Sequence, residues 1–218
     1  MPHGAFRDRV NHKAYCTNMN ETIDSVLTYW FGTEQSNTAI AEDRKKIWWG
    51  KDDQVDQEIA GQFRELTESV ASGDLDHWRD SSKGLLASII CTDQFSRNMY
   101  RGSPRSFSYD TVALQLAHQA VGTAMDTALS AIERVFMYLP FEHSEDLENQ
   151  QKSLELFNLL YENCDHSEKE VFSGYLDYAQ RHYDVIKQFG RFPHRNEILG
   201  RKSTELENEF LAQPGSSF

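Results

Sequence analysis

Apolar residues recur at intervals of three and four along almost the whole chain. Seven stripes of this kind occur, and they begin at Ile23, Val55, Leu85, Val112, Ile132, Leu154 and Tyr175. The spacing places the apolar side chains of each stripe on one face of an α-helix. The sequence has no sustained alternation of apolar and polar residues and no Asn-Gly hairpin, which are the usual signals of β-strands. The pattern therefore predicts an all-α protein.

Segments rich in glycine, proline and polar residues separate the stripes and predict loops. They cover residues 31–38, 49–53, 72–78, 101–104 and 190–196. Ser106 is a candidate N-cap for the helix that carries Val112, and Ser203-Thr204 followed by Glu207 resembles a capping box for a short last helix. Because the connections are short, we expect about seven to nine helices in a bundle or a short superhelix.

The chain of 218 residues is long enough for one well-filled core. Its 13 Phe, 9 Tyr and 4 Trp argue against disorder, which is typical of chains with few aromatic residues. We expect the large apolar side chains of the stripes to be buried, among them Trp30, Phe63, Ile89, Phe95, Phe136, Leu139 and Phe189. The chain length and the supply of large apolar side chains therefore predict a single folded domain.

The first 18 residues carry no helical apolar period, and Met19 directly precedes the first stripe. We therefore expect a flexible leader or non-native extension at 1–18 and a single all-α domain at 19–218. An organelle-targeting role is the alternative, because Arg7, Arg9 and Lys13 make this segment basic, although Asp8 and the short length argue against it.

The net charge of −12 disfavours nucleic-acid partners, which need Lys and Arg to neutralise phosphates, and it disfavours anionic membrane surfaces. The longest apolar run, residues 84–90, is too short to cross a bilayer. The three cysteines, Cys16, Cys91 and Cys164, form no CxxC pair, so free thiols in the reducing cytoplasm are expected. Phosphate-binding glycine loops and dinucleotide fingerprints are lacking, and no cofactor is predicted.

A set of motifs follows these helices in a fixed order. They are YWFG (29–32), WWGKD (48–52), DQFSRNMYRG (93–102), FMYLPFEHSED (136–146), FGRFPHRN (189–196), LGRKST (199–204) and PGSSF (214–218). Together they resemble the family known as domain of unknown function 924, over about residues 23–218. The resemblance implies a tetratricopeptide-like all-α fold. It implies no established activity and identifies no catalytic residue.

The first polar motif places Asp93 and Arg97 four residues apart, on one helix face where they can pair. Asn98 and Arg101 follow near the end of the same helix. In one interpretation these residues form a salt bridge and a basic helix C-terminus. In the other, Arg97 and Arg101 are forked donors to a carboxylate or phosphate ligand.

The second polar motif follows Pro140, which is expected in the first turn of a new helix. Acidic and amide side chains then share one helix face, which fits either N-terminal capping or a ligand site. The members of this face are Glu142, Glu145, Asp146 and Asn149. Metal binding through Glu142, His143, Glu145 and a second histidine is disfavoured, because HExxH and paired Glu-x-x-His motifs are absent, and no metal is predicted.

The third polar motif is a turn fixed by Gly190 and Pro193, which presents four cationic or polar groups from a rigid support. The projecting residues are Arg191, His194, Arg195 and Asn196. They either bind a ligand or connect neighbouring helix ends. His182, on an apolar face, is either a buried core residue or part of the same site.

Two functions remain open. In the first, one pocket binds, or binds and transforms, a small anionic molecule, with Trp49, Tyr100 and Phe141 as apolar walls. The candidate acid–base residues are His143, His194 and Glu142, and the candidate ligand-binding residues are Arg97, Asn98, Arg101, His182, Arg191, Arg195 and Asn196. In the second, the chain is a tetratricopeptide-like module that binds a protein or peptide without catalysis. A closed site favours the first function, and an open groove with exposed arginines favours the second.

The charge pattern also predicts that the three polar motifs meet in space. Arginines in an acidic chain need counter-charges, since an unpaired buried charge costs several kcal/mol. The acidic turn after Pro140 is the densest supply of such charges. We therefore expect it to neutralise Arg191 and Arg195, unless an external anion does so.

Overall fold

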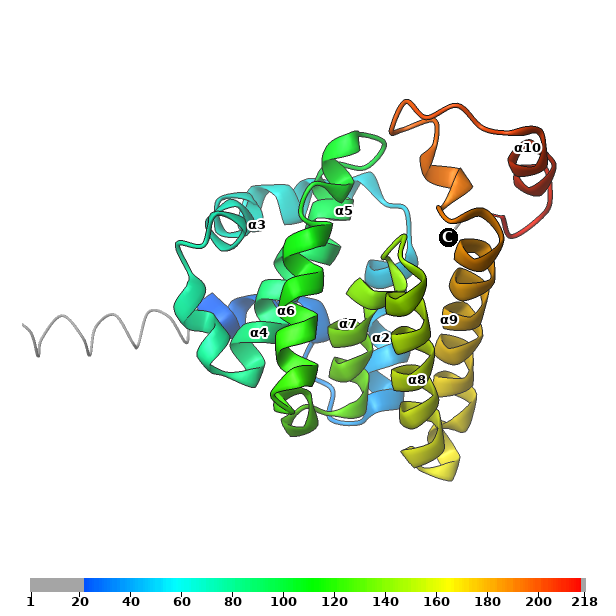
Figure 1. Cartoon of the computed structure of the whole chain (residues 1–218). Coiled ribbons are helices and arrows are strands. Elements are labelled where there is room, and N and C mark those ends of the chain that lie inside the picture. Colours follow the sequence, from blue (N-terminus) through cyan, green and yellow to red (C-terminus); the bar gives the residue numbers. More distant parts are fainter. Residues whose placement is uncertain (1–21, 217–218) are drawn as a thin grey trace, which may run out of the picture.

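The computed structural model describes residues 22–216, and these residues form an all-α bundle without a β-strand (Figure 1). Residues 22–31 are helical. The further α-helices are α2 (Asn37–Trp49), α3 (Asp53–Ser72), α4 (Ser82–Ile89), α5 (Ser96–Met99), α6 (Asp110–Gly122), α7 (Ala131–Glu142), α8 (Leu147–Asn163), α9 (Lys169–Phe189) and α10 (Glu205–Leu211). The all-α prediction is confirmed. The expected leader at 1–18 lies outside the described residues.

Helices of the central bundle that are near one another in the sequence lie side by side. Helix α4 contacts α6, α6 contacts α7, α7 contacts α8, and α8 forms an extensive interface with α9. The short helix α10 lies apart from this bundle, beyond the C-terminal end of α9 (Figure 1). Within residues 22–216, no helix is both long and apolar enough to cross a bilayer.

Local sequence signals explain where several helices begin and end. The side chain of Asp52 accepts a hydrogen bond from the amide of Gln54 at the start of α3. The predicted capping box of the last helix is confirmed, with Thr204 as N-cap and Glu207 as its partner in α10. Ser106 is not the N-cap of α6, because residues 104–107 form a separate 3-10 turn, η3, which Ser103 caps.

Aromatic side chains build the core around Trp30. Its ring meets Phe95 and Phe136 edge-on, with centroid distances of 5.6 and 5.5 Å. Six of the seven side chains predicted to be buried are buried. Phe189 is only partly buried, because it lies in a small separate cluster beside Phe210 at the end of α9.

Pro140 lies inside α7 and does not begin a new helix, which corrects the prediction from sequence. The helix continues to Glu142, and α8 starts only at Leu147, with Asp146 as its N-cap. The apolar residues on both sides of Pro140 are buried, and their packing outweighs the one hydrogen bond that proline removes. Glu142 and Glu145 therefore do not share one helix face.

A π-helical segment, η2 (Ile90–Phe95), joins α4 to α5 within one continuous helical rod. Single π turns are rare in proteins, and those that occur are often found at functional sites. All six residues of η2 are buried, including the charged Asp93. The segment thus carries a carboxylate into the interior of the bundle.

Candidate functional site

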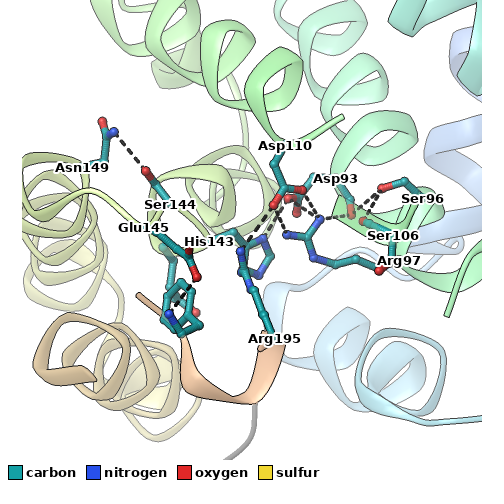
Figure 2. Close-up of polar contacts among 12 residues, drawn as sticks. Asp93, Ser96, Arg97, Ser106, Asp110, His143, Ser144, Glu145, Asn149 and Arg195 are labelled. Atoms are coloured by element: carbon teal, nitrogen blue, oxygen red, sulfur yellow. Dashed lines mark hydrogen bonds and ion pairs between the residues drawn. The ribbon is translucent and has the colours of Figure 1, made fainter. Parts of the chain in front are cut away.

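The three polar motifs meet where η2, α5, the end of α7 and the turn after α9 come together, as predicted. Arg97 and Arg195 both approach Asp110, and His143 contacts Asp93 beside them (Figure 2). We use the term central polar cluster for the charged and imidazole side chains gathered here, which are Asp93, Arg97, Asp110, Glu142, His143, His182 and Arg195.

Asp93 is fully buried and lies at the centre of this cluster. Its Oδ1 is 3.0 Å from Nη1 of Arg97 and 2.8 Å from Nδ1 of His143, while Oδ2 accepts a 2.5 Å hydrogen bond from Gln94. Burial alone would raise the pKa of Asp93, but the charge of Arg97 and the His143 contact hold it below its ordinary value. Asp93 is therefore a carboxylate at neutral pH.

His143 is oriented by this carboxylate. Since an ionised carboxylate only accepts hydrogen bonds, Nδ1 of His143 carries the proton and Nε2 keeps a lone pair. Burial and the nearby Arg97 lower the pKa of His143, so its ring is neutral at pH 7. A histidine aligned by a buried carboxylate in this way is suited to accept a proton.

Gln150 in α8 holds the turn that carries His143 through hydrogen bonds to its backbone. The side-chain amide of this fully buried residue donates to the carbonyls of Glu142 and Ser144, at 2.6 and 2.7 Å. These bonds satisfy carbonyl groups at the C-terminal end of α7 that have no helical partner. They fix the backbone on both sides of His143.

Asp110, the first residue of α6, joins the two arginines of the cluster. It accepts two hydrogen bonds from Arg97, at 2.9 and 3.2 Å. Its Oδ2 is also 3.6 Å from Nη1 of Arg195, which is an ion pair at longer range. Arg97 is thus held by two carboxylates, whereas Arg195 forms a single ion pair among residues 22–216, the one with Asp110.

Two aromatic rings lie close to Arg195, with its guanidinium carbon 4.8 Å from the centre of Phe107 and 4.4 Å from that of Phe192. Its side chain is only 8% exposed. Nε is buried and has no hydrogen-bond partner among residues 22–216. Burial, together with the charge of Arg97, lowers the pKa of Arg195 to about 10. A buried arginine with unused donors is costly unless an anion completes its hydrogen bonds.

Glu142 and His182 form a second carboxyl–imidazole pair beside the first. Oε1 of Glu142 is 3.3 Å from Nδ1 of His182, which donates to the carbonyl of Tyr178 at 2.8 Å. Burial and the negative Asp93 raise the pKa of Glu142 to about 8. Burial lowers the pKa of His182 to about 3. At neutral pH both side chains are therefore mainly uncharged.

Two of the predicted arginines lie in closed ion pairs outside the cluster. Arg101 holds Asp56 of α3 through Nε and Nη2, at 2.6 and 2.9 Å, and Asn98 donates to the same carboxylate. Arg191 holds Glu207 of α10 through the same two nitrogens, at 2.6 and 2.7 Å. The expectation of one pocket shared by all candidate arginines does not hold for these two.

The acidic turn after Pro140 neutralises a different arginine from those predicted. Glu145 makes two hydrogen bonds with Arg201, at 2.6 and 2.9 Å, and accepts one from the amide of Phe192 at 2.8 Å. Asn196 supports this contact by accepting a hydrogen bond from Arg201. Glu145 therefore anchors the turn that carries Arg195 without pairing with Arg195 itself.

A cavity of about 700 Å³ lies on the other side of this turn, next to α10. Its lining includes Pro193, His194 and Arg201, whereas Arg195 points toward the central polar cluster (Figure 2). Burial and the adjacent Arg195 lower the pKa of His194 to about 4. The predicted walls are dispersed: Phe141 is buried, Tyr100 lies with Arg105, and Trp49 is half exposed.

Among residues 22–216, no three His, Cys, Asp or Glu side chains are grouped so as to hold a metal ion. Cys91 is buried, and burial raises the pKa of its thiol to about 12, so it is a poor nucleophile.

Comparison with known proteins identifies the family of this chain. The family model described as bacterial protein of unknown function (DUF924) matches residues 26–215. The chain belongs to this family. A solved structure, titled as that of a protein of unknown function from Agrobacterium tumefaciens, is 33% identical to this chain, with a TM-score of 0.67. The match covers 81% of this chain and 99% of that one. No curated protein matches the chain.

Two members of the central polar cluster of this DUF924 protein, Asp93 and Asp110, were not among the site residues predicted from its sequence. Asp93 was visible as the expected partner of Arg97, and that pair is present. Asp110 belongs to none of the polar motifs, and as the first residue of a helix it looks like an ordinary N-terminal acid. Only the packing of α6 against η2 and the position of the turn after α9 bring it between the two arginines.

Proposed function

We propose that this chain binds a small molecule through a carboxylate or phosphate group at the central polar cluster, and that His143 exchanges a proton with the bound molecule. The observation that carries the proposal is Arg195, a nearly buried cation whose Nε has no hydrogen-bond partner in the described chain. Ligand pockets typically combine apolar walls with a few such convergent polar groups.

The other arginines of the chain indicate what Arg195 would bind. Arg101 and Arg191 each use Nε and Nη2 together to hold one carboxylate in a forked geometry. The Nε of Arg195 belongs to the same kind of fork and is not used. Two phenyl rings pack against its guanidinium, and an oxyanion would meet the N–H groups at the edge of the planar group. This arrangement suits carboxylate and phosphate groups.

Access and chemistry support the same location. The side chains of Arg97, Asp110 and His143 are 20%, 24% and 15% exposed, so one edge of the cluster reaches solvent. His143, aligned by Asp93, presents the lone pair of Nε2 as a base. The neutral Glu142 next to it is a source of a proton. Carboxyl groups held in opposite protonation states side by side are typical of acid–base sites.

The alternative function, a tetratricopeptide-like module that binds peptides, requires arginines exposed in an open groove. The arginines of the cluster are mostly buried, which favours a small ligand over a peptide. We also propose a cytoplasmic location, since Cys91 and Cys164 are both free thiols.

Sulfate, inorganic phosphate and succinate serve as probes of the site. We expect them to raise the melting temperature of the wild-type protein at constant ionic strength, and we expect Arg195→Met to weaken their binding at least tenfold. The variant should be as stable as the wild type or more so, because methionine packs against Phe107 and Phe192 without an unpaired buried cation. Calorimetric titration and urea unfolding measure the two effects.

Arg191→Met is the matched control. It should destabilise the protein, because it leaves the carboxylate of Glu207 without its forked partner, and it should leave the affinity for sulfate unchanged. Absence of any response to the three probes, or an unchanged response in Arg195→Met, would overturn the proposed function.

A further inference from the structure

We propose that the central polar cluster takes up one proton when it binds an oxyanion, and that this proton goes to Nε2 of His143. The inference rests on the proposed function and adds to it a coupling between ligand binding and pH. Its basis is the charge balance of the cluster and the geometry of the Asp93–His143 pair.

The charges of the cluster balance before any ligand is bound. Two carboxylates, Asp93 and Asp110, face two guanidinium groups, Arg97 and Arg195. An oxyanion on the fork of Arg195 would add a negative charge without a counter-charge. Because uncompensated charge in a buried site costs several kcal/mol, a neutral neighbour that can become a cation will be driven to do so.

His143 faces charged or titratable groups from each of the elements that meet at the cluster. These groups are Asp93 in η2, Arg97 in α5, Asp110 in α6, Glu142 in α7, His182 in α9, and His194 and Arg195 in η6 (Pro193–Arg195). The ring of His182 lies 6.3 Å from that of His143. Figure 2 shows Arg195 beside His143, with Asp110 next to both.

Among these groups, His143 is the one best placed to accept the proton. Its Nδ1–H already points at the carboxylate of Asp93, 2.8 Å away, which stabilises an imidazolium ion. Nε2 then remains as the acceptor. An oxyanion at Arg195 would add a second negative charge on this side, and the bound proton would lie between the two anions.

The neighbouring groups are less suited to accept it. Glu142 already carries a proton at neutral pH, because burial raises its pKa to about 8. His182 is more deeply buried than His143, and its side chain is 5% exposed. His194 has the cation of Arg195 next to it, which opposes a second positive charge.

The coupling has a defined sign. The pKa of His143 is lowered in the free protein and should rise when an anion binds beside it. Between the free and bound pKa values, the complex holds one more proton than the free protein, so the affinity falls as the pH rises. In that window the dissociation constant should increase about tenfold per pH unit.

Sulfate is the probe, because it does not titrate in the range tested. Its dissociation constant is measured from pH 5.5 to 8.5 at constant ionic strength, and the proton count is taken by calorimetry in two buffers of different ionisation enthalpy. We expect uptake approaching one proton in wild type, a flat pH profile in His143→Gln, and a retained slope in His194→Gln. The nitrogen NMR signals of the wild-type histidines identify the receiving atom without a variant, should His143→Gln fail to fold.

The outcomes separate the two proposals. Sulfate binding that depends on Arg195 but is independent of pH would overturn the proton uptake and leave the proposed function standing. The same slope in His143→Gln, or protonation of another histidine, would also overturn it. Failure of sulfate to bind wild type at every pH would overturn both proposals.

Discussion

Asp93→Asn is expected to lower the free energy of unfolding by about 3–5 kcal/mol at pH 7, which is typical of breaking a buried ion pair. Asp93 is fully buried, and it is the carboxylate shared by Arg97 and His143. Asparagine has the same shape but no charge, so Arg97 would keep only Asp110 as a counter-charge. Urea unfolding followed by circular dichroism measures the loss.

Asp177→Asn is the control, because Asp177 and Arg181 form an ion pair with the same i,i+4 spacing on the surface of α9. Their side chains are 55% and 53% exposed, and an exposed pair of this kind contributes less than about 1 kcal/mol. Equal losses in the two variants would mean that burial of Asp93 does not determine its contribution to stability.

Glu142→Gln is expected to stabilise the protein increasingly as the pH rises. Glu142 has a pKa raised from 4.5 to about 8 in the folded state, because burial and Asp93 oppose its ionisation. A pKa raised in this way makes a contribution to stability that is present below pH 4.5 and is lost as the pH rises toward 8. Glutamine resembles the protonated acid and does not titrate.

The gain of Glu142→Gln over wild type should therefore be below about 1 kcal/mol at pH 5 and on the order of 4 kcal/mol at pH 8.5. Urea unfolding of both proteins across this range measures it. The control is Glu145→Gln in the neighbouring turn, where the hydrogen bonds from Arg201 lower the pKa of Glu145 despite its burial. That variant should lose about 1–2 kcal/mol at pH 7. A gain in Glu142→Gln that does not change with pH would contradict the assignment of a protonated Glu142.

Much of the fold was predictable because helix formation depends on short-range patterns. The stripe that starts at Ile132 predicted α7, and the Thr204–Glu207 capping box predicted the start of α10. Both signals lie within one or two helical turns of the structure that they predict. Pro140 misled because its effect on a helix depends on the packing of its neighbours, which is a tertiary property.

Two of the four candidate arginines and two of the three candidate histidines lie in the central polar cluster, and most of their partners could not be predicted from the sequence. Arg97 and Arg195 were recognised because cations concentrated in an acidic chain need counter-charges. Which carboxylate each arginine meets depends on helices that are distant in sequence. Glu207 pairs with Arg191, Glu145 with Arg201, and Asp110 lies between Arg97 and Arg195.

The sequence by itself determined that this chain forms an α-helical bundle, that it belongs with the DUF924 proteins, and that its three polar motifs come together. Each of these depends on local periodicity, on a run of motifs or on the sign of the net charge. Only the tertiary structure decided that Arg101 and Arg191 are closed in forked ion pairs while Nε of Arg195 is not. The physical reason is that burial and hydrogen-bond partners come from contacts between elements that are distant in the chain, and one sequence read alone does not specify those contacts.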